Sequence, residues 1–176
     1  MIWKRPVITG GVGLLVLALA VSSLARKVDD PLPENVLADR VLVEKAQRRL
    51  TLLKSGQVLK TYKVALGRNP EGAKLQEGDG RTPEGIYTIL NRKDDSAFHR
   101  ALRISYPDEA DRVRAQAAGV SPGGDIMIHG IKNGLGWLGS LHTTSDWTEG
   151  CIAVTDEEIE EIWRAVPDGT PVEIRP

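Results

Sequence analysis

Cysteine and histidine are scarce in this 176-residue chain, which contains one cysteine, Cys151, and three histidines. A disulfide within the chain is excluded because Cys151 has no second cysteine to pair with. Metal ligands usually occur as closely spaced histidines or as paired cysteines, and neither pattern is present. The sequence therefore predicts no metal site, and it leaves a lone thiol whose purpose has to be explained.

An excess of charge of one sign is also missing. The 23 basic and 24 acidic residues give a formal net charge of −1, and no basic face is visible. Nucleic acid is therefore not expected as a partner. The hydrophobic content of 41% and charged content of 27% are typical of a globular protein rather than a disordered or fully membrane-embedded one. The length suits one domain with a short additional segment.

The one long apolar stretch lies near the N-terminus, at residues 7–24, after Lys4 and Arg5. Basic residues followed by an apolar run are typical of an export signal. The run is also near the ~18-residue lower limit for a membrane-spanning helix, and residues 23–25 have the small-x-small form of a cleavage site. We interpret residues 1–25 as a signal peptide or an N-terminal membrane anchor, and the sequence leaves both open.

This segment predicts an exported protein of the periplasm or cell envelope. It would stay attached to the inner membrane only if the segment is retained, and no other membrane contact is expected. Residues 26–38 contain two prolines and no periodicity, which predicts a linker. Residues 39–176 are then the folded domain.

Short strands dominate the expected domain. Charged residues alternate with apolar ones in several runs, which predicts antiparallel strands with one wet face. Thr155 precedes Glu158 with the spacing of a helix capping box. The fold class predicted is mainly β, a partly open β-sandwich with a few peripheral short helices. Strands are expected at residues 40–45, 49–54, 58–66, 86–90, 125–129 and 171–174, and helices at residues 108–118 and 156–165.

Two short glycine-containing stretches can carry chemistry. One is an apolar strand that ends at His129 and is followed by Gly130; the other is Thr148-Glu149-Gly150-Cys151. A cysteine attacks a carbonyl as its thiolate, and a nearby imidazole can take the proton and later return it. A glycine before the cysteine allows tight backbone geometry and leaves N–H groups around residues 149–151 to face an oxyanion. A lone cysteine can also be a small buried hydrophobe, so this pair alone is weak support.

A family resemblance strengthens the interpretation. From about Val41 to Ile174 the chain resembles the L,D-transpeptidase (YkuD) catalytic domain. Residues 78–87 are similar to its Gly-Asp and Thr-Pro-x-Gly-x-Tyr segment, residues 126–130 to its strand ending in His-Gly, and residues 148–151 to its Ser/Thr-His-Gly-Cys loop. The resemblance implies that Cys151 is the nucleophile, His129 the general base and the Gly130 carbonyl the group that orients the imidazole. It also implies that Thr148 and Gly150 form the nucleophile loop and its oxyanion site.

The reaction implied by the resemblance is acyl transfer on peptidoglycan stem peptides, without a cofactor. Cys151 would attack the carbonyl on the L-centre side of an L,D bond, expel D-alanine and form a thioester. An amine of a neighbouring stem, or of a protein to be anchored to the wall, would then accept the acyl group. Two alternatives stay open. Water as acceptor would give an L,D-carboxypeptidase or endopeptidase, and a non-catalytic wall-binding domain would use neither residue.

Two residues depart from the family pattern. Glu149 stands where a histidine is common, and Ala153 stands where arginine or asparagine is common. A carboxylate that pointed at the thiol would raise its pKa, so we expect Glu149 to turn outward or toward a basic partner. Ala153 removes an expected substrate contact. Glu149, His142 and Trp147 are candidates for lining the substrate cleft, although His142 also fits an ordinary loop position and packing under the loop is expected for Trp147 and Trp137.

Overall fold

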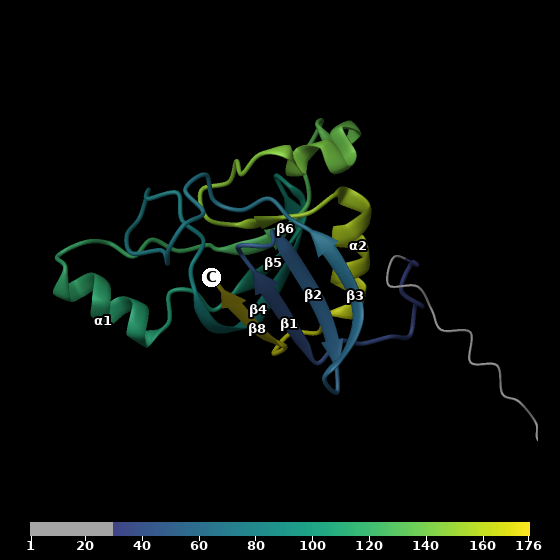
Figure 1. Ribbon diagram of the computed structural model, residues 1–176, viewed down its shortest axis with the longest axis horizontal. Coiled ribbons are helices and arrows are strands. Elements are labelled where there is room, and N and C mark those ends of the chain that lie inside the picture. The colour runs from purple at the N-terminus through teal and green to yellow at the C-terminus, as the bar shows by residue number, and fades with distance from the viewer. Residues whose placement is uncertain (1–29) are drawn as a thin grey trace, which may run out of the picture.

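The computed structural model describes residues 30–176 (Figure 1). The expected export segment lies outside these residues, and none of the helices within them is long and apolar enough to cross a membrane. The strands are β1 (Arg40–Glu44), β2 (Arg49–Lys54), β3 (Gln57–Lys63), β4 (Gly85–Ser96), β5 (His99–Ile104), β6 (Met127–His129), β7 (Ile152–Ala153) and β8 (Pro171–Arg175). The helices are α1 (Glu109–Ala117), α2 (Asp156–Ala165) and the 3₁₀ segment η1 (Gly136–Thr144).

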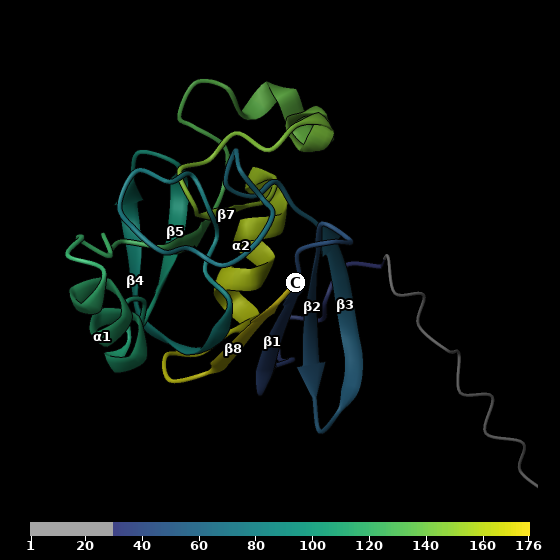
Figure 2. The same cartoon turned by 60° about the vertical axis from the view of Figure 1, so that its left-hand side comes forward.

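All eight strands join in one open mixed sheet with the order β3-β2-β1-β8-β4-β5-β6-β7. Strand β4 connects its two halves, because residues 85–88 pair with β8 and residues 89–96 pair with β5. The sheet curls around its apolar side, so the two halves face each other across the core (Figure 2). The mainly β class predicted from the sequence is confirmed, and the two faces of the sandwich belong to one continuous sheet.

Helix α2 fills the space inside the curl. It begins at a capping box in which the Thr155 hydroxyl accepts from the Glu158 N–H at 3.2 Å and the Glu158 carboxylate accepts from the Thr155 N–H at 2.9 Å. Ile159, Ile162 and Ala165 then follow helical spacing and are buried in the core. The sequence placed this helix correctly but treated it as peripheral, whereas the structure shows one of its faces within the core.

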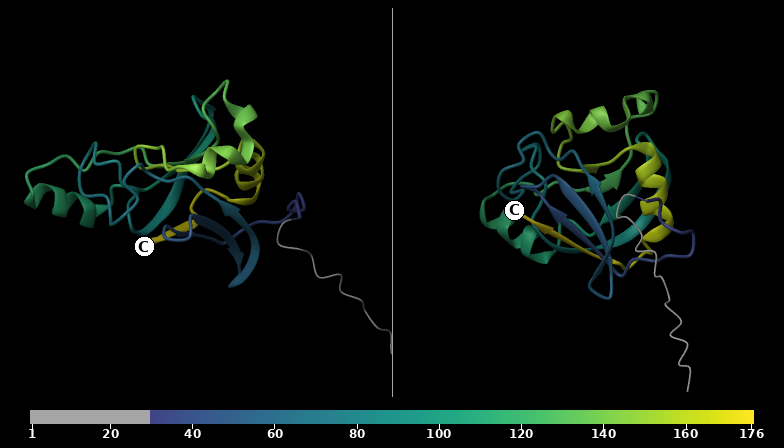
Figure 3. Two further views of the ribbon diagram at one scale, coloured as in Figure 1. Left: turned by 45° about the horizontal axis from the view of Figure 1, so that its top comes forward. Right: turned by 45° about the vertical axis from the view of Figure 1, so that its right-hand side comes forward.

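Both halves of the sheet also hold the polar side of α2. Glu161 is 2.7 Å from the Lys60 ammonium of β3. Glu160 is 2.7 Å from both Arg100 and His99 of β5. The views in Figures 2 and 3 agree that α2 lies between the β1–β3 strands and the β4–β5 strands. The helix therefore fixes the distance between the two halves of the sheet.

The end of the expected linker packs against the same helix. Leu32 is buried, and its carbonyl accepts from Arg164 at 3.3 Å. The Ala38 N–H donates to the Ala165 carbonyl at 2.8 Å. The chain is thus already attached to the domain before β1 begins.

Three elements were not predicted, and one of them is the two-residue strand β7. Strand β5 has the sequence His-Arg-Ala-Leu-Arg-Ile, and its charged residues break the alternation that marks a strand. Ala101, Leu102 and Ile104 are nevertheless buried. Segment η1 is short, irregular and rich in glycine and threonine, with no side-chain cap at its start. In Figure 1 it lies at one end of the molecule, and α1 projects at another.

Candidate active site

The pairing of β6 with β7 brings His129 and Cys151 to the same face of the sheet. The two strands are parallel, with Ile128 opposite Ile152 and His129 opposite Ala153. Paired residues point to the same side and side chains alternate along each strand, so His129 shares its side with Ala153 and with Cys151, two residues earlier. His129 and Cys151 accordingly line one cavity of about 480 Å³.

The surroundings of His129 fix the orientation and tautomer of its ring. It is 4% exposed, and its Nδ1 lies 2.7 Å from the Gly130 carbonyl oxygen. A carbonyl only accepts, so Nδ1 carries the proton and Nε2 of the neutral ring keeps a free lone pair. The imidazole packs against Phe98, with ring centroids 4.6 Å apart, and contacts Trp147 at 5.8 Å. A side chain at position 130 would place its Cβ 2.7 Å from an Asp156 oxygen, which explains the glycine.

A tight loop holds the thiol. The Thr148 hydroxyl donates to the Cys151 carbonyl at 2.7 Å and accepts from the Gly150 N–H at 3.1 Å. Gly150 has φ of +131°, and a Cβ there would lie 2.5 Å from the Arg81 carbonyl oxygen. The Gly150 N–H is therefore engaged, contrary to the expectation that it would be free for an oxyanion. Within residues 30–176 the Cys151 N–H has no backbone or side-chain acceptor and remains available.

The resting pair is neutral. Burial raises the pKa of the Cys151 thiol; the Met127 N–H opposes this, and the Asp125 carboxylate raises the pKa further. Burial also lowers the pKa of His129 to about 4, against a smaller opposing effect of the Gly130 carbonyl. At neutral pH the site holds a thiol and an uncharged imidazole. The thiol rests 3.6 Å from the Asp125 carbonyl oxygen.

Glu149 points away from the thiol, as expected. Its carboxylate forms an ion pair with Arg68, and the side chain is 64% exposed. The Arg68 backbone N–H donates to the Thr148 carbonyl at 2.9 Å, which joins the nucleophile loop to the segment after β3. The negative charge at position 149 is thus neutralised by Arg68.

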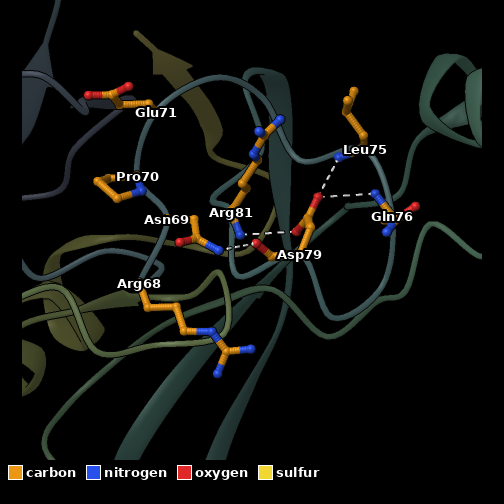
Figure 4. Close-up of a pocket in the computed structure, with 8 residues that line it drawn as sticks. All are labelled: Arg68, Asn69, Pro70, Glu71, Leu75, Gln76, Asp79 and Arg81. Carbon is orange, nitrogen blue, oxygen red and sulfur yellow. Dashed lines mark hydrogen bonds between the residues drawn. The ribbon is translucent and has the colours of Figure 1, made fainter.

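Asp79 shapes the loop that contains Leu75, Gln76 and Arg81 (Figure 4). Its carboxylate accepts from the N–H groups of Leu75, Gln76 and Arg81 and from the Lys74 ammonium, at 2.8 to 3.1 Å. Burial opposes its ionisation, but these four donors lower its pKa to about 2. The Arg81 carbonyl of this loop packs against Gly150. The loop also borders a second cavity of about 610 Å³.

The comparison with known families decides the family to which the chain belongs. Residues 38–174 match the L,D-transpeptidase catalytic domain, YkuD. The chain belongs to this family.

Relatives and solved structures agree with this assignment. YafK of Escherichia coli (strain K12), named as an L,D-transpeptidase, is 28% identical over 156 residues, covering 84% of this chain and 56% of its own length. The helical cell shape determining protein Pgp2 of Campylobacter jejuni is 25% identical with a TM-score of 0.60, covering 80% of this chain and 48% of that one. An Enterococcus faecium L,D-transpeptidase shares the fold at 16% identity and a TM-score of 0.53, covering 80% and 50%. The chain spans about half the length of these proteins.

The remaining residues named from the sequence lie in different places. Trp147 lines the cavity that His129 and Cys151 share, whereas His142 is buried and does not line it; the rings of His142 and Trp147 are 6.4 Å apart. Trp137 is 76% exposed, so the packing expected for it is wrong. Ala153 is fully buried and exchanges two backbone hydrogen bonds with Ala65, which leaves it no contact with a substrate.

Sequence reasoning missed several residues of this L,D-transpeptidase cavity. Phe98, Asp125, Lys93 and Lys132 all line it. None belongs to a motif that marks the site. Phe98 and Lys93 reach the cavity only because β4 pairs with β5 and β5 pairs with β6, which a single sequence does not reveal.

The neutral state of His129 predicts a pH dependence of stability. The pKa of His129 in the folded protein, about 4, is below the ordinary 6.5. The contribution of its neutral ring to the free energy of unfolding is therefore complete above pH 6.5 and is lost as pH falls toward 4. The loss should total about 3 kcal/mol, at about 1.4 kcal/mol per pH unit at most. Urea unfolding between pH 7 and pH 4 should show this decline in the wild type and a shallower one in His129→Gln. Equal slopes for the two proteins would contradict the buried neutral imidazole.

Proposed function

We propose that this chain is a cysteine-dependent acyltransferase acting on peptidoglycan stem peptides, with Cys151 as nucleophile and His129 as general base. The observation that carries the proposal is the single cavity lined by the thiol and by an imidazole whose Nδ1 is tied to the Gly130 carbonyl. A structural cysteine or a wall-binding surface would need neither the tautomer nor the shared cavity. Membership of the L,D-transpeptidase family supplies the substrate class.

The proposed reaction begins when a stem-peptide carbonyl, on the L-centre side of an L,D bond, reaches the sulfur. The thiol proton passes to Nε2 of His129 as the sulfur–carbon bond forms, and the Cys151 N–H donates to the oxyanion. The carbon–nitrogen bond then breaks, and His129 returns the proton to the departing amine of D-alanine. A thioester remains on Cys151.

The second half restores the enzyme. An acceptor amine, from a neighbouring stem or a wall-anchored protein, attacks the thioester and gives its proton to His129, which returns it to the sulfur. Because thiol and imidazole are neutral at rest, the thiolate forms only as the carbonyl is attacked, which is general-base catalysis. Water can replace the amine in the same steps and would give a hydrolase.

Turnover of a purified disaccharide-tetrapeptide tests this function. The wild type should release D-alanine and give cross-linked dimers, whereas Cys151→Ala should release none. Loss of the base should slow release by about 10²- to 10⁴-fold in His129→Ala. Mass spectrometry of separated products gives both readouts, and circular dichroism controls for folding. Tripeptide without dimers would assign water as the acceptor, and no Cys151-dependent product would exclude the proposal.

We also infer that residues 1–25 export the domain, with residues 26–38 as the connection to it. The support is the order of basic and apolar residues at the N-terminus and a substrate class located outside the cytoplasm. A reporter active only in the cytoplasm, fused after Pro176, should be silent in growing cells. Strong reporter signal would show that the domain stays inside.

A further inference from the structure

The catalytic cavity carries a positive charge that the reaction steps do not use. Four charged side chains line it: Asp125, Glu149, Lys93 and Lys132. Both carboxylates are ion-paired with arginines, Asp125 with Arg103 at 3.1 Å and Glu149 with Arg68. Within residues 30–176 neither lysine side chain forms an ion pair or a hydrogen bond, so two cations are left uncompensated.

Lys93 is aimed at the site by the sheet register. It pairs with Ala101 of β5, and Ala101 pairs with His129 of β6. Residues opposite one another in neighbouring strands point to the same side, so Lys93 shares the face of His129 and Cys151. With strands about 4.8 Å apart, its backbone lies roughly 10 Å from that of His129, which is within reach of an extended lysine and a peptide between them.

Lys132 approaches from another element. It lies three residues after His129, the last residue of β6, and its side chain is exposed at the cavity. Most of the remaining cavity wall comes from apolar groups such as Phe98 and Met127, which offer nothing to an anion, and the indole N–H of Trp147 is buried. The two lysines therefore supply the unneutralised charge at the catalytic pair from two independent elements.

The departure at Ala153 makes this charge more significant. The position that in the family commonly holds arginine or asparagine is a fully buried alanine here, bonded to Ala65 through its backbone. No cation can reach the substrate from that place. Positive charge at the cavity has instead to come from elsewhere in the chain.

We propose that Lys93 and Lys132 determine substrate specificity by binding carboxylate groups of the stem peptide beside the scissile bond. This inference rests on the proposed function, because it assigns the chemistry by which that site selects its donor. A stem tetrapeptide offers a C-terminal carboxylate on its last D-residue, and a second one where its third residue is a dicarboxylic diamino acid. Both present the same chemistry to an ammonium group, which binds a carboxylate as a compact point charge.

The test compares kcat/KM for three donors: the free tetrapeptide stem, its C-terminal amide, and the stem amidated on the diamino acid. For the wild type, each amidation should lower kcat/KM roughly tenfold, the loss of one charge-assisted contact. Lys93→Met and Lys132→Met should each lower kcat/KM on the free stem to a similar degree. Each should also remove the sensitivity to one amidation, which identifies the carboxylate that this lysine binds.

Two controls separate recognition from general effects. Lys54→Met removes a lysine on β2, outside the cavity, and should leave all three values unchanged. Lys93→Arg and Lys132→Arg should recover most of the activity on the free stem, and the amidation effect should shrink as salt rises.

The outcomes distinguish this inference from the function beneath it. If Cys151-dependent release occurs with every donor, but amidation has no effect or the lysine variants keep the full wild-type sensitivity, the lysines do not select the donor and only this inference fails. If no donor is processed by the wild type, the proposed function itself fails.

Discussion

The register between β6 and β7 is the constraint on which the site depends. His129 and Cys151 face one cavity only because Ile128 lies opposite Ile152, and a slip of one residue would turn one of them to the other side of the sheet. Strand β7 has two residues, so it could not hold this register alone. The Ala65–Ala153 bridge fixes it from one side, and the Val154 N–H, which donates to the His129 carbonyl at 2.9 Å, fixes it at the end.

The rest of the domain stabilises that register and sets its electrostatics. Helix α2 starts shortly after β7, and its Asp156 carboxylate accepts from the Ile131 N–H at 2.8 Å, so the helix is anchored to the segment that follows His129. Burial by Phe98 and Trp147 keeps the imidazole uncharged, and the loop organised by Asp79 closes over Gly150. The proposed reaction therefore depends on positioning a neutral pair rather than on a preformed thiolate.

Local signals in the sequence were sufficient for much of this. The Thr155 capping box predicted α2 with its observed bounds, and the alternating runs predicted β1, β2 and β3. The His-Gly and Gly-Cys stretches predicted His129 and Cys151, the two residues that the fold brings to one cavity. The sequence was not sufficient where an outcome depends on distant partners: β5 is buried despite its charged residues, and the Gly150 N–H is engaged by the Thr148 hydroxyl. Lys93 enters the cavity only through the order of three strands.

The central claim is that Cys151 carries the acyl group, and intact-mass spectrometry of protein quenched in acid during turnover tests it most directly. With a stem tetrapeptide as the only donor, the account predicts one adduct per chain, with the mass of the stem without D-alanine. This adduct should map to the Cys151 peptide and be released by hydroxylamine as expected for a thioester. D-alanine release that persists in Cys151→Ala, or an adduct on any other residue, would contradict the account.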